Sequence, residues 1–498
     1  MSTKRAVLLS LLSWTLLALC YPPFPLGPLA LAVLAPWFYV LKTTTKRRAL
    51  TASYLGAFSF NIISMYWLYH VGEVAPPALI FSGLLLGIAF LSLFTLLCAW
   101  VFVKLKDSSL LFLFPLFWAG IEVVRSKGDM SFPWFSLGLV FGDSDSLSQA
   151  FTLLGVFGCS ALVIASNMFI AYAVLKKRLI LVPLALAASF YILNICGIHA
   201  WGGGSVSNTA TVAVVQPSIH QTEKWSREYY DSVMNKTWEL FSTLDPAGIQ
   251  LVLFPETAIP TFLNASMREY EFLEDYAARN NTAIVTGALN RERNKERKRK
   301  GYNIYNSAFL FGSGKPAAEY RKTHLVPFSE RIPFDNVFSI INYVDLGGGE
   351  FSQGDSLVIW QPGNFSPLIC YEAIYGSILR DAKRKGAKFI ANITNDGWFM
   401  RSIAPYQHLN LVRAHAVENG IGVVRAANTG ISAFIEPDGR IIEKTKLFEE
   451  RIIVHDMPLE TRWTLYSVIG DYVEWVLLVF SLVMIAVAMC FKKIRAPS

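Results

Sequence analysis

The stretch "PLICYEAIYG" (residues 367–376) places a cysteine where an apolar, β-rich run gives way to a helical pattern. Cys370 is the only cysteine between residues 208 and 456, and a tyrosine and a glutamate follow it directly. A turn from strand to helix presents a side chain together with free backbone N–H groups. Such a turn suits a nucleophile, so Cys370 is the first candidate for the chemistry of this chain.

Strand-like runs and helical patterns alternate on both sides of this turn. The strand-like runs are rich in Val, Ile, Phe and Ala, and they cover residues 209–217, 249–256, 282–289, 305–312, 365–370, 387–394 and 422–435. Helical periodicity covers residues 226–243, 266–279, 373–385 and 404–419. This alternation predicts an α/β layered domain over residues 208–456.

The rest of the chain has the composition of a membrane protein. Of the 498 residues, 53% are hydrophobic, which is more than an ordinary soluble enzyme of this size contains. We predict an N-terminal transmembrane domain of about seven helices over residues 1–200 and a C-terminal transmembrane helix over 470–491. The eight candidate spans cover about 6–20, 24–41, 49–69, 78–103, 109–124, 150–175, 179–198 and 470–491.

Basic residues recur at alternate ends of these spans. They lie at Lys4–Arg5 and in "KTTTKRR" (42–48), "KLK" (104–106), "KKR" (176–178) and "KKIR" (492–495). The positive-inside rule then predicts cytoplasmic termini, with residues 208–456 on the periplasmic side of a bacterial inner membrane. The net charge of +8 belongs largely to these patches, so we predict no nucleic-acid partner. Within the spans Glu122 is the main ionisable residue, which disfavours an ion-transport path.

Three polar residues stand where strand-like runs end: Glu256 in "LVLFPETAIP", Lys322 in "YRKTHLVPF", and Cys370. Strand ends are where functional groups gather in α/β sheets. A thiol holds its proton at neutral pH, and a carboxylate can accept it as the sulfur attacks. An ammonium can stabilise the oxyanion that forms. The chain has no CxxC or HExxH motif, so we predict neither a metal nor a cofactor.

These motifs carry a resemblance to known families. "FPETA", "YRKTHLVPF" and "CYE" resemble the Glu-Lys-Cys triad of the nitrilase, or carbon–nitrogen hydrolase, superfamily. The apolar N-terminal half, the final span and three further motifs resemble the membrane-embedded apolipoprotein N-acyltransferase family. These motifs are "VVQPSIHQTEKW" (214–225), "TNDGWF" (394–399) and "RAANTG" (425–430). The resemblance implies an α-β-β-α layered sandwich for residues 208–456.

The resemblance also implies roles for residues. Glu256 would be the general base, Lys322 the oxyanion partner and Cys370 the nucleophile. The supporting active-site residues would be Glu330, Tyr371, Glu372, Trp225 (on a mobile arm) and Asn306. Two alternatives stay open: Trp225 as an anchor of an amphipathic helix, and Glu372 as a structural cap or ion-pair partner. Ser329 stands where the family commonly has glycine, which bears on the backbone before Glu330.

The implied activity is the last step of bacterial lipoprotein maturation. An acyl chain would leave a phospholipid, phosphatidylethanolamine as the family implies, and form a thioester on Cys370. The α-amine of an S-diacylglyceryl cysteine at the N-terminus of an apolipoprotein would then accept it, with ping-pong kinetics. Two other readings stay open: a membrane-tethered nitrilase-type amidase, and a non-catalytic membrane protein with a nitrilase-like domain. The basic segment 291–300 is either a solvated loop or a contact for anionic lipid headgroups.

Overall fold

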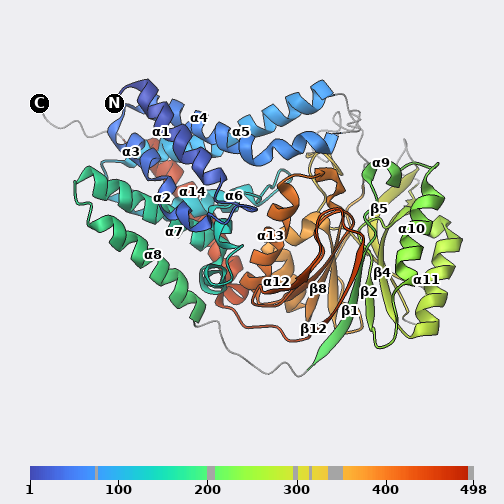
Figure 1. Cartoon of the computed structure of the whole chain (residues 1–498). Coiled ribbons are helices and arrows are strands. Elements are labelled where there is room, and N and C mark those ends of the chain that lie inside the picture. Colours follow the sequence, from blue (N-terminus) through green and yellow to red (C-terminus); the bar gives the residue numbers. More distant parts are fainter. Residues whose placement is uncertain (73–76, 199–207, 295–300, 313–316, 335–350, 492–498) are drawn as a thin grey trace, which may run out of the picture. The chain divides into compact units, whose positions relative to one another are not determined.

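The computed structural model describes residues 1–72, 77–198, 208–294, 301–312, 317–334 and 351–491 (Figure 1). The chain divides near residues 201 and 465 into two compact units. One unit contains the N-terminal residues together with the last helix, and the other contains the residues between them.

The described residues of the first unit form helices and the turns between them, with no β-strand. Its α-helices are α1 (Thr3–Ala18), α2 (Ala30–Val33), α3 (Ala35–Thr43), α4 (Lys46–Met65), α5 (Pro77–Leu105), α6 (Phe114–Arg125), α7 (Phe151–Leu175), α8 (Leu181–Ile198) and α14 (Leu465–Cys490). Among the described residues, three helical segments are long and apolar enough to cross a membrane: Ile80–Leu105, Leu147–Leu175 and Leu465–Cys490. The prediction of about eight spans is therefore not confirmed. The expected span 24–41 is broken into short helices, and only Phe114–Arg125 of 109–124 is α-helical.

Close backbone contact joins the last helix to the earlier ones. A Cβ added at Gly120 of α6 would lie 1.9 Å from Ser481 Oγ and 2.3 Å from the Leu477 carbonyl oxygen of α14. Only glycine permits this approach, because any larger residue would push the two helices apart. The buried Glu122, two residues further along α6, accepts hydrogen bonds from Trp118 Nε1 and Leu137 N, both at 2.9 Å. These bonds give Glu122 a structural role within the helical unit.

The second unit is built on two β-sheets. One has the order β12-β1-β2-β4-β5-β6, with β3 (Ile259–Phe262) paired to β4; the other has the order β11-β10-β9-β8-β7. The first sheet contains β1 (Thr209–Gln216), β2 (Leu251–Leu253), β4 (Ala283–Arg293), β5 (Tyr302–Phe311), β6 (Ala318–Arg321) and β12 (Arg451–Pro458). The second contains β7 (Phe365–Ile369), β8 (Phe389–Thr394), β9 (Gly422–Ala427), β10 (Ala433–Ile435) and β11 (Ile441–Lys444).

The core follows from the two-residue period of the strands. On β1, Val212 and Val214 face the second sheet and pack with Phe389 and Val424, whereas Val215 faces helices of the opposite side. Both faces of this strand are thus buried, which explains why its sequence is a continuous apolar run rather than an alternating one.

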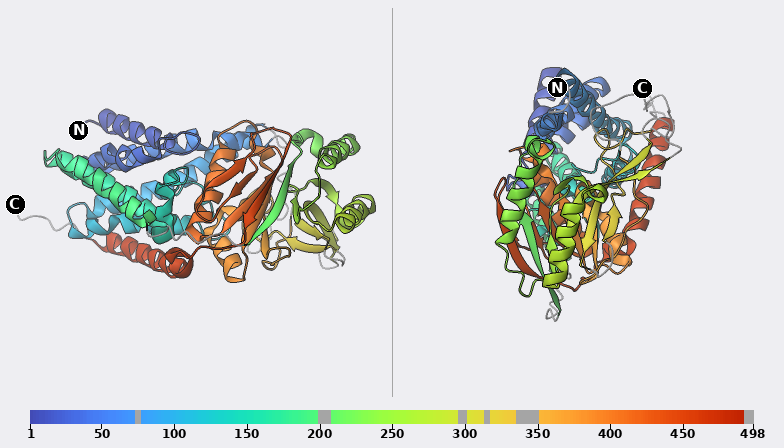
Figure 2. Two further views of the ribbon diagram at one scale, coloured as in Figure 1. Left: turned by 60° about the horizontal axis from the view of Figure 1, so that its bottom comes forward. Right: turned by 90° about the vertical axis from the view of Figure 1, so that its right-hand side faces the viewer.

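Helices cover the outer faces of both sheets. Helices α10 (Tyr230–Ser242) and α11 (Met267–Asn280) pack on the first sheet, and α12 (Gly376–Arg384) and α13 (Ala404–Asn419) pack on the second (Figures 1 and 2). The result is the α-β-β-α sandwich. The short helix α9 (Gln221–Lys224) follows β1.

Several predicted elements have different bounds. The run 422–435 is a pair of antiparallel strands, β9 and β10, rather than one strand, because "NTGIS" (428–432) forms the turn between them. Helix α12 begins at Gly376, after a 3-10 turn over Cys370–Ile374. Of the basic segment 291–300, residues 291–293 end β4, and residues 295–300 lie outside the described part of the chain.

Candidate active site

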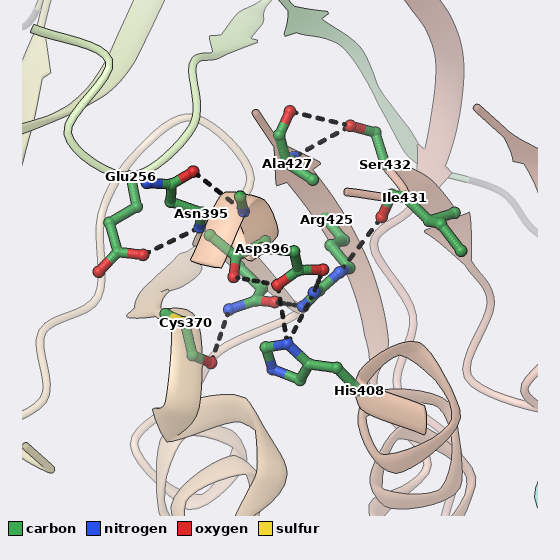
Figure 3. A network of polar contacts seen from close by, with 12 residues as sticks. Glu256, Cys370, Asn395, Asp396, His408, Arg425, Ala427, Ile431 and Ser432 are labelled. Carbon is green, nitrogen blue, oxygen red and sulfur yellow. Dashed lines mark hydrogen bonds and ion pairs between the residues drawn. The ribbon is translucent and has the colours of Figure 1, made fainter. Parts of the chain in front are cut away.

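The predicted triad comes from three strand ends on two sheets. Glu256 follows β2 in the first sheet, Lys322 directly follows β6 in the same sheet, and Cys370 directly follows β7 in the second. The two sheets pack face to face, so residues far apart in sequence meet where these strands end. Figure 3 shows Glu256 and Cys370 close to each other, with Asn395, which directly follows β8, hydrogen-bonded to Glu256.

Buried carboxylates surround the Lys322 ammonium group. Lys322 Nζ lies 2.9 Å from Glu330 Oε1 and 3.6 Å from Glu256 Oε1, and the lysine side chain is only 1% exposed. Asn306 Nδ2 donates to both carboxylates, at 2.7 Å to Glu256 Oε1 and 3.1 Å to Glu330 Oε1. Burial by itself lowers the pKa of Lys322, but Glu330 and Glu256 outweigh burial and hold that pKa above its usual range. Lys322 therefore stays an ammonium at neutral pH.

Cys370 occupies a strained turn. Its φ of 51° lies in the left-handed region, which side chains with a Cβ rarely adopt. Burial raises the pKa of the Cys370 thiol to about 12, and the nearby Glu256 carboxylate adds to this, against a smaller opposite effect of Lys322. The thiol consequently keeps its proton at neutral pH, and attack by the sulfur needs a base close by.

Glu256 is held by groups that leave its carboxylate aimed at this pocket. Its Oε2 accepts a hydrogen bond of 2.9 Å from the backbone N–H of Asn395, at the end of β8. Asn395 Nδ2 in turn donates to Gln221 Oε1 at 2.9 Å. With Asn306 on its other oxygen, Glu256 has a fixed orientation and is 6% exposed.

A second lysine approaches the same pocket. Lys224, the last residue of α9, is 3% exposed, and its Nζ donates to the main-chain oxygen of Glu256 at 2.9 Å. Burial lowers the pKa of Lys224 to about 7, with partial compensation from Glu256 and Cys370. The sequence does not single out Lys224, because a lysine in a short polar segment is normally solvated. Its neighbour Trp225, predicted as a supporting residue, is 42% exposed.

Glu372 lies beside the triad as a fully buried acceptor of hydrogen bonds. Its Oε2 accepts from the Ile369 N–H at 2.7 Å, and its Oε1 accepts from the Thr323 N–H at 2.6 Å and the Tyr320 hydroxyl at 2.7 Å. These contacts favour a structural role for Glu372, one of the two alternatives that the sequence left open. Tyr371 is buried and packs edge-to-face on Tyr375, with ring centroids 5.4 Å apart.

Ser329, which stands where the family commonly has glycine, does not adopt the left-handed backbone conformation that would require glycine. The left-handed residue of this loop is Phe328, with a φ of 63°, and Glu330 Oε2 closes the loop by accepting from Val326 N at 2.9 Å.

Comparison with known proteins finds a family match in each of the two units. The carbon–nitrogen hydrolase family matches residues 211–464, which contain the sandwich and all the residues above. The N-terminal domain of apolipoprotein N-acyltransferases matches residues 15–169. The fold and the site therefore define a carbon–nitrogen hydrolase domain in a membrane protein.

Relatives that match almost the whole chain identify the family more closely. The chain is 30% identical over 516 aligned residues to the apolipoprotein N-acyltransferase of Geobacter metallireducens, covering 99% of this chain and 97% of that protein. It is 29% identical to that of Haemophilus influenzae, covering 93% and 91%, and 30% identical to that of Rickettsia prowazekii, covering 89% and 90%. The chain belongs to the apolipoprotein N-acyltransferase family.

Proposed function

We propose that this protein transfers an acyl chain from a membrane phospholipid to the α-amino group of the N-terminal S-diacylglyceryl cysteine of apolipoproteins, through a thioester on Cys370. The observation that carries the proposal is the close grouping of the Glu256 carboxylate, the Lys322 ammonium and the Cys370 thiol. Family membership over the whole chain length supports the choice of substrates.

In the first half-reaction Glu256 accepts the proton of the Cys370 thiol as the sulfur attacks the carbonyl carbon of the phospholipid ester. The carbonyl oxygen becomes an oxyanion, which the Lys322 ammonium and backbone N–H groups after Cys370 stabilise. The C–O bond to the glycerol then breaks. The lysophospholipid takes the proton from Glu256 as it leaves, and the acyl chain remains on sulfur.

In the second half-reaction the α-amine attacks the thioester carbon and gives a proton to Glu256. The C–S bond breaks, the sulfur leaves as a thiolate, and the Glu256 proton returns to it. The product is an amide and a regenerated thiol. Glu330 and Asn306 act on this cycle by holding Lys322 and Glu256 in place. Trp225 and Tyr371 belong to the substrate-contacting surface in this proposal.

The helical unit has a purpose in this reaction because both substrates reside in the bilayer. The proposal includes about eight transmembrane helices, cytoplasmic termini and a periplasmic catalytic domain over about residues 208–456 of a bacterial inner-membrane protein. The alternation of basic patches supports this topology. Phosphatidylethanolamine is the proposed acyl donor.

The test uses the full-length protein in detergent micelles with radiolabelled phosphatidylethanolamine and a diacylated lipopeptide. We expect a hydroxylamine-labile acyl group on Cys370 and label in the lipopeptide, both absent in Cys370→Ala. Cys159→Ala, in α7 of the helical unit, serves as the matched cysteine control. Transfer by Cys370→Ala contradicts the mechanism. Hydrolysis of an amide substrate with no need for an amine acceptor favours the amidase instead.

A further inference from the structure

A fully buried polar network lies behind the catalytic pocket (Figure 3). It contains Asn392 and Asp396 from the end of β8, His408 from α13 and Arg425 from β9, each at most 1% exposed. Charged side chains are rarely buried so completely unless they are paired. None of these four residues has a role in the proposed mechanism.

Arg425 connects the members of this network. Its Nη2 donates to Asp396 Oδ2 at 2.8 Å, and its Nη1 donates to Asn392 Oδ1 at 2.6 Å. His408 Nδ1 lies 3.0 Å from Asp396 Oδ1. Burial raises the pKa of Asp396, but Arg425 and His408 outweigh it and hold that pKa well below its usual range. Asp396 is therefore a carboxylate whose charge Arg425 balances.

Two contacts extend from this network to Cys370. Asn392 Nδ2 donates to the Leu368 carbonyl oxygen at 3.2 Å and approaches the Cys370 carbonyl oxygen at 3.5 Å, which fixes the backbone of the strained turn. The other contact passes through Thr394. Strands β7 and β8 are parallel with Ile369 opposite Ile393, so Thr394 stands beside Cys370 at the next position.

The Thr394 hydroxyl has one proton to donate and two neighbouring acceptors, Asp396 Oδ1 and the Cys370 sulfur. Its Oγ1 donates to Asp396 Oδ1 at 3.2 Å, and the hydroxyl lies close enough to Cys370 to lower the pKa of that thiol. If the hydroxyl turns away from Asp396, the carboxylate keeps Arg425 and His408 as partners. The hydroxyl can thus change acceptors without leaving a buried charge unpaired, which is the costly outcome in a protein interior.

We propose that Thr394 is a further catalytic residue, whose hydroxyl donates to Asp396 while Cys370 is a thiol or thioester and to the Cys370 sulfur whenever that atom is a thiolate. The proton stays on Thr394 throughout, so only the hydrogen bond moves. Arg425 and Asp396 are positioning residues that hold this donor beside the sulfur.

The Cys370 sulfur carries negative charge twice in the proposed cycle, when it attacks the ester and when it leaves the thioester. The effect of Thr394 on the rate of acyl transfer therefore rests on the proposed function. The titratable groups that act on the sulfur are Glu256, Lys322, Asp396, Lys224 and Tyr371. The two lysines favour the thiolate, and the two carboxylates oppose it. A neutral hydrogen-bond donor beside the sulfur would stabilise the thiolate without changing this balance of charge.

The test compares Thr394→Ser with Thr394→Ala, because both lack the threonine methyl group and differ only in the hydroxyl. Alkylation of the full-length protein by iodoacetamide is followed against pH by mass spectrometry of the peptide that contains Cys370. This readout measures thiolate formation without lipid or acceptor. We expect Thr394→Ala to react about tenfold more slowly than Thr394→Ser at any pH below the thiol pKa, the usual effect of one hydrogen bond to a charged group.

Thr282 provides the matched control pair. It is equally buried, at 1% exposure, and its hydroxyl donates to the Ile249 carbonyl oxygen at 2.8 Å, at the start of β4 rather than at the triad. Thr282→Ser and Thr282→Ala should lose stability without separating in alkylation rate. If Thr394→Ala does not fold, Thr394→Val, which keeps the side-chain volume, takes its place.

Equal alkylation profiles for the variants with and without the Thr394 hydroxyl would overturn the inference. A clear separation of those profiles in a protein that transfers no acyl group would leave the inference standing and count against the proposed function.

Discussion

Replacing Glu372 by glutamine is expected to damage the catalytic domain through structure rather than through proton transfer. Glutamine can keep its oxygen at the Oε1 position, where Tyr320 and Thr323 donate, but its amide group then faces the Ile369 N–H, which donates to Oε2 in the native protein. One buried donor is left without an acceptor, and the remaining bonds lose the charge on their acceptor. Together these effects cost about 3 kcal/mol of the free energy of unfolding.

That loss corresponds to a fall of roughly 6–12 °C in the melting temperature of a domain of about 250 residues. The N–H donors belong to Ile369 and Thr323, the direct neighbours of Cys370 and Lys322, so acyl-enzyme formation should slow as well. Intrinsic tryptophan fluorescence on heating measures the first effect, and single-turnover labelling of Cys370 measures the second.

Glu269→Gln is the matched control, since Glu269 is a buried glutamate of α11 that accepts from Ser266. It should lower the melting temperature less and leave labelling unchanged. A Glu372→Gln protein that melts within about 1 °C of the native protein, yet has lost activity, would refute the structural reasoning and make Glu372 a direct participant.

Three further expectations concern charges in the pocket. Glu330→Gln removes the nearest carboxylate from Lys322, so the pKa of Lys322 should fall and the high-pH limit of acyl transfer should move to lower pH; an unchanged pH–rate profile would contradict this. In the native protein, iodoacetamide labelling of Cys370 should rise continuously from pH 7 to pH 10, because its pKa is raised to about 12; a plateau near pH 8 would show a thiol of ordinary acidity. Lys224 has a pKa lowered to about 7 and a higher one when unfolded, so the unfolded chain binds more protons between these values and stability rises with pH there. Lys224→Met should flatten that rise in denaturant titrations at pH 7 and pH 9, and an equal rise in both proteins would exclude the effect.

The sequence was sufficient for features that depend on local pattern. The alternation of apolar strand-like runs with amphipathic helices predicted the layered α/β domain, because period and composition reflect which faces are buried. Placement of Glu256, Lys322 and Cys370 at strand ends followed from the same pattern, and the structure brings these three side chains close together. The run 422–435 was wrong as a single strand because a tight turn inside an apolar run has a weak signal.

The sequence by itself determined which faces of each strand and helix are buried. This pattern also divided the chain into an apolar helical part and an α/β sandwich with polar residues at strand ends. Tertiary structure alone decided that Lys224 reaches the backbone of Glu256, that Glu372 accepts the Ile369 N–H, and that Thr394 donates to Asp396 beside Cys370. The physical reason is that a polar residue acquires its partners only when two sheets close over it. Its charge state then depends on burial and on neighbours more than 100 positions away in the chain, as with Glu256 and Asn395.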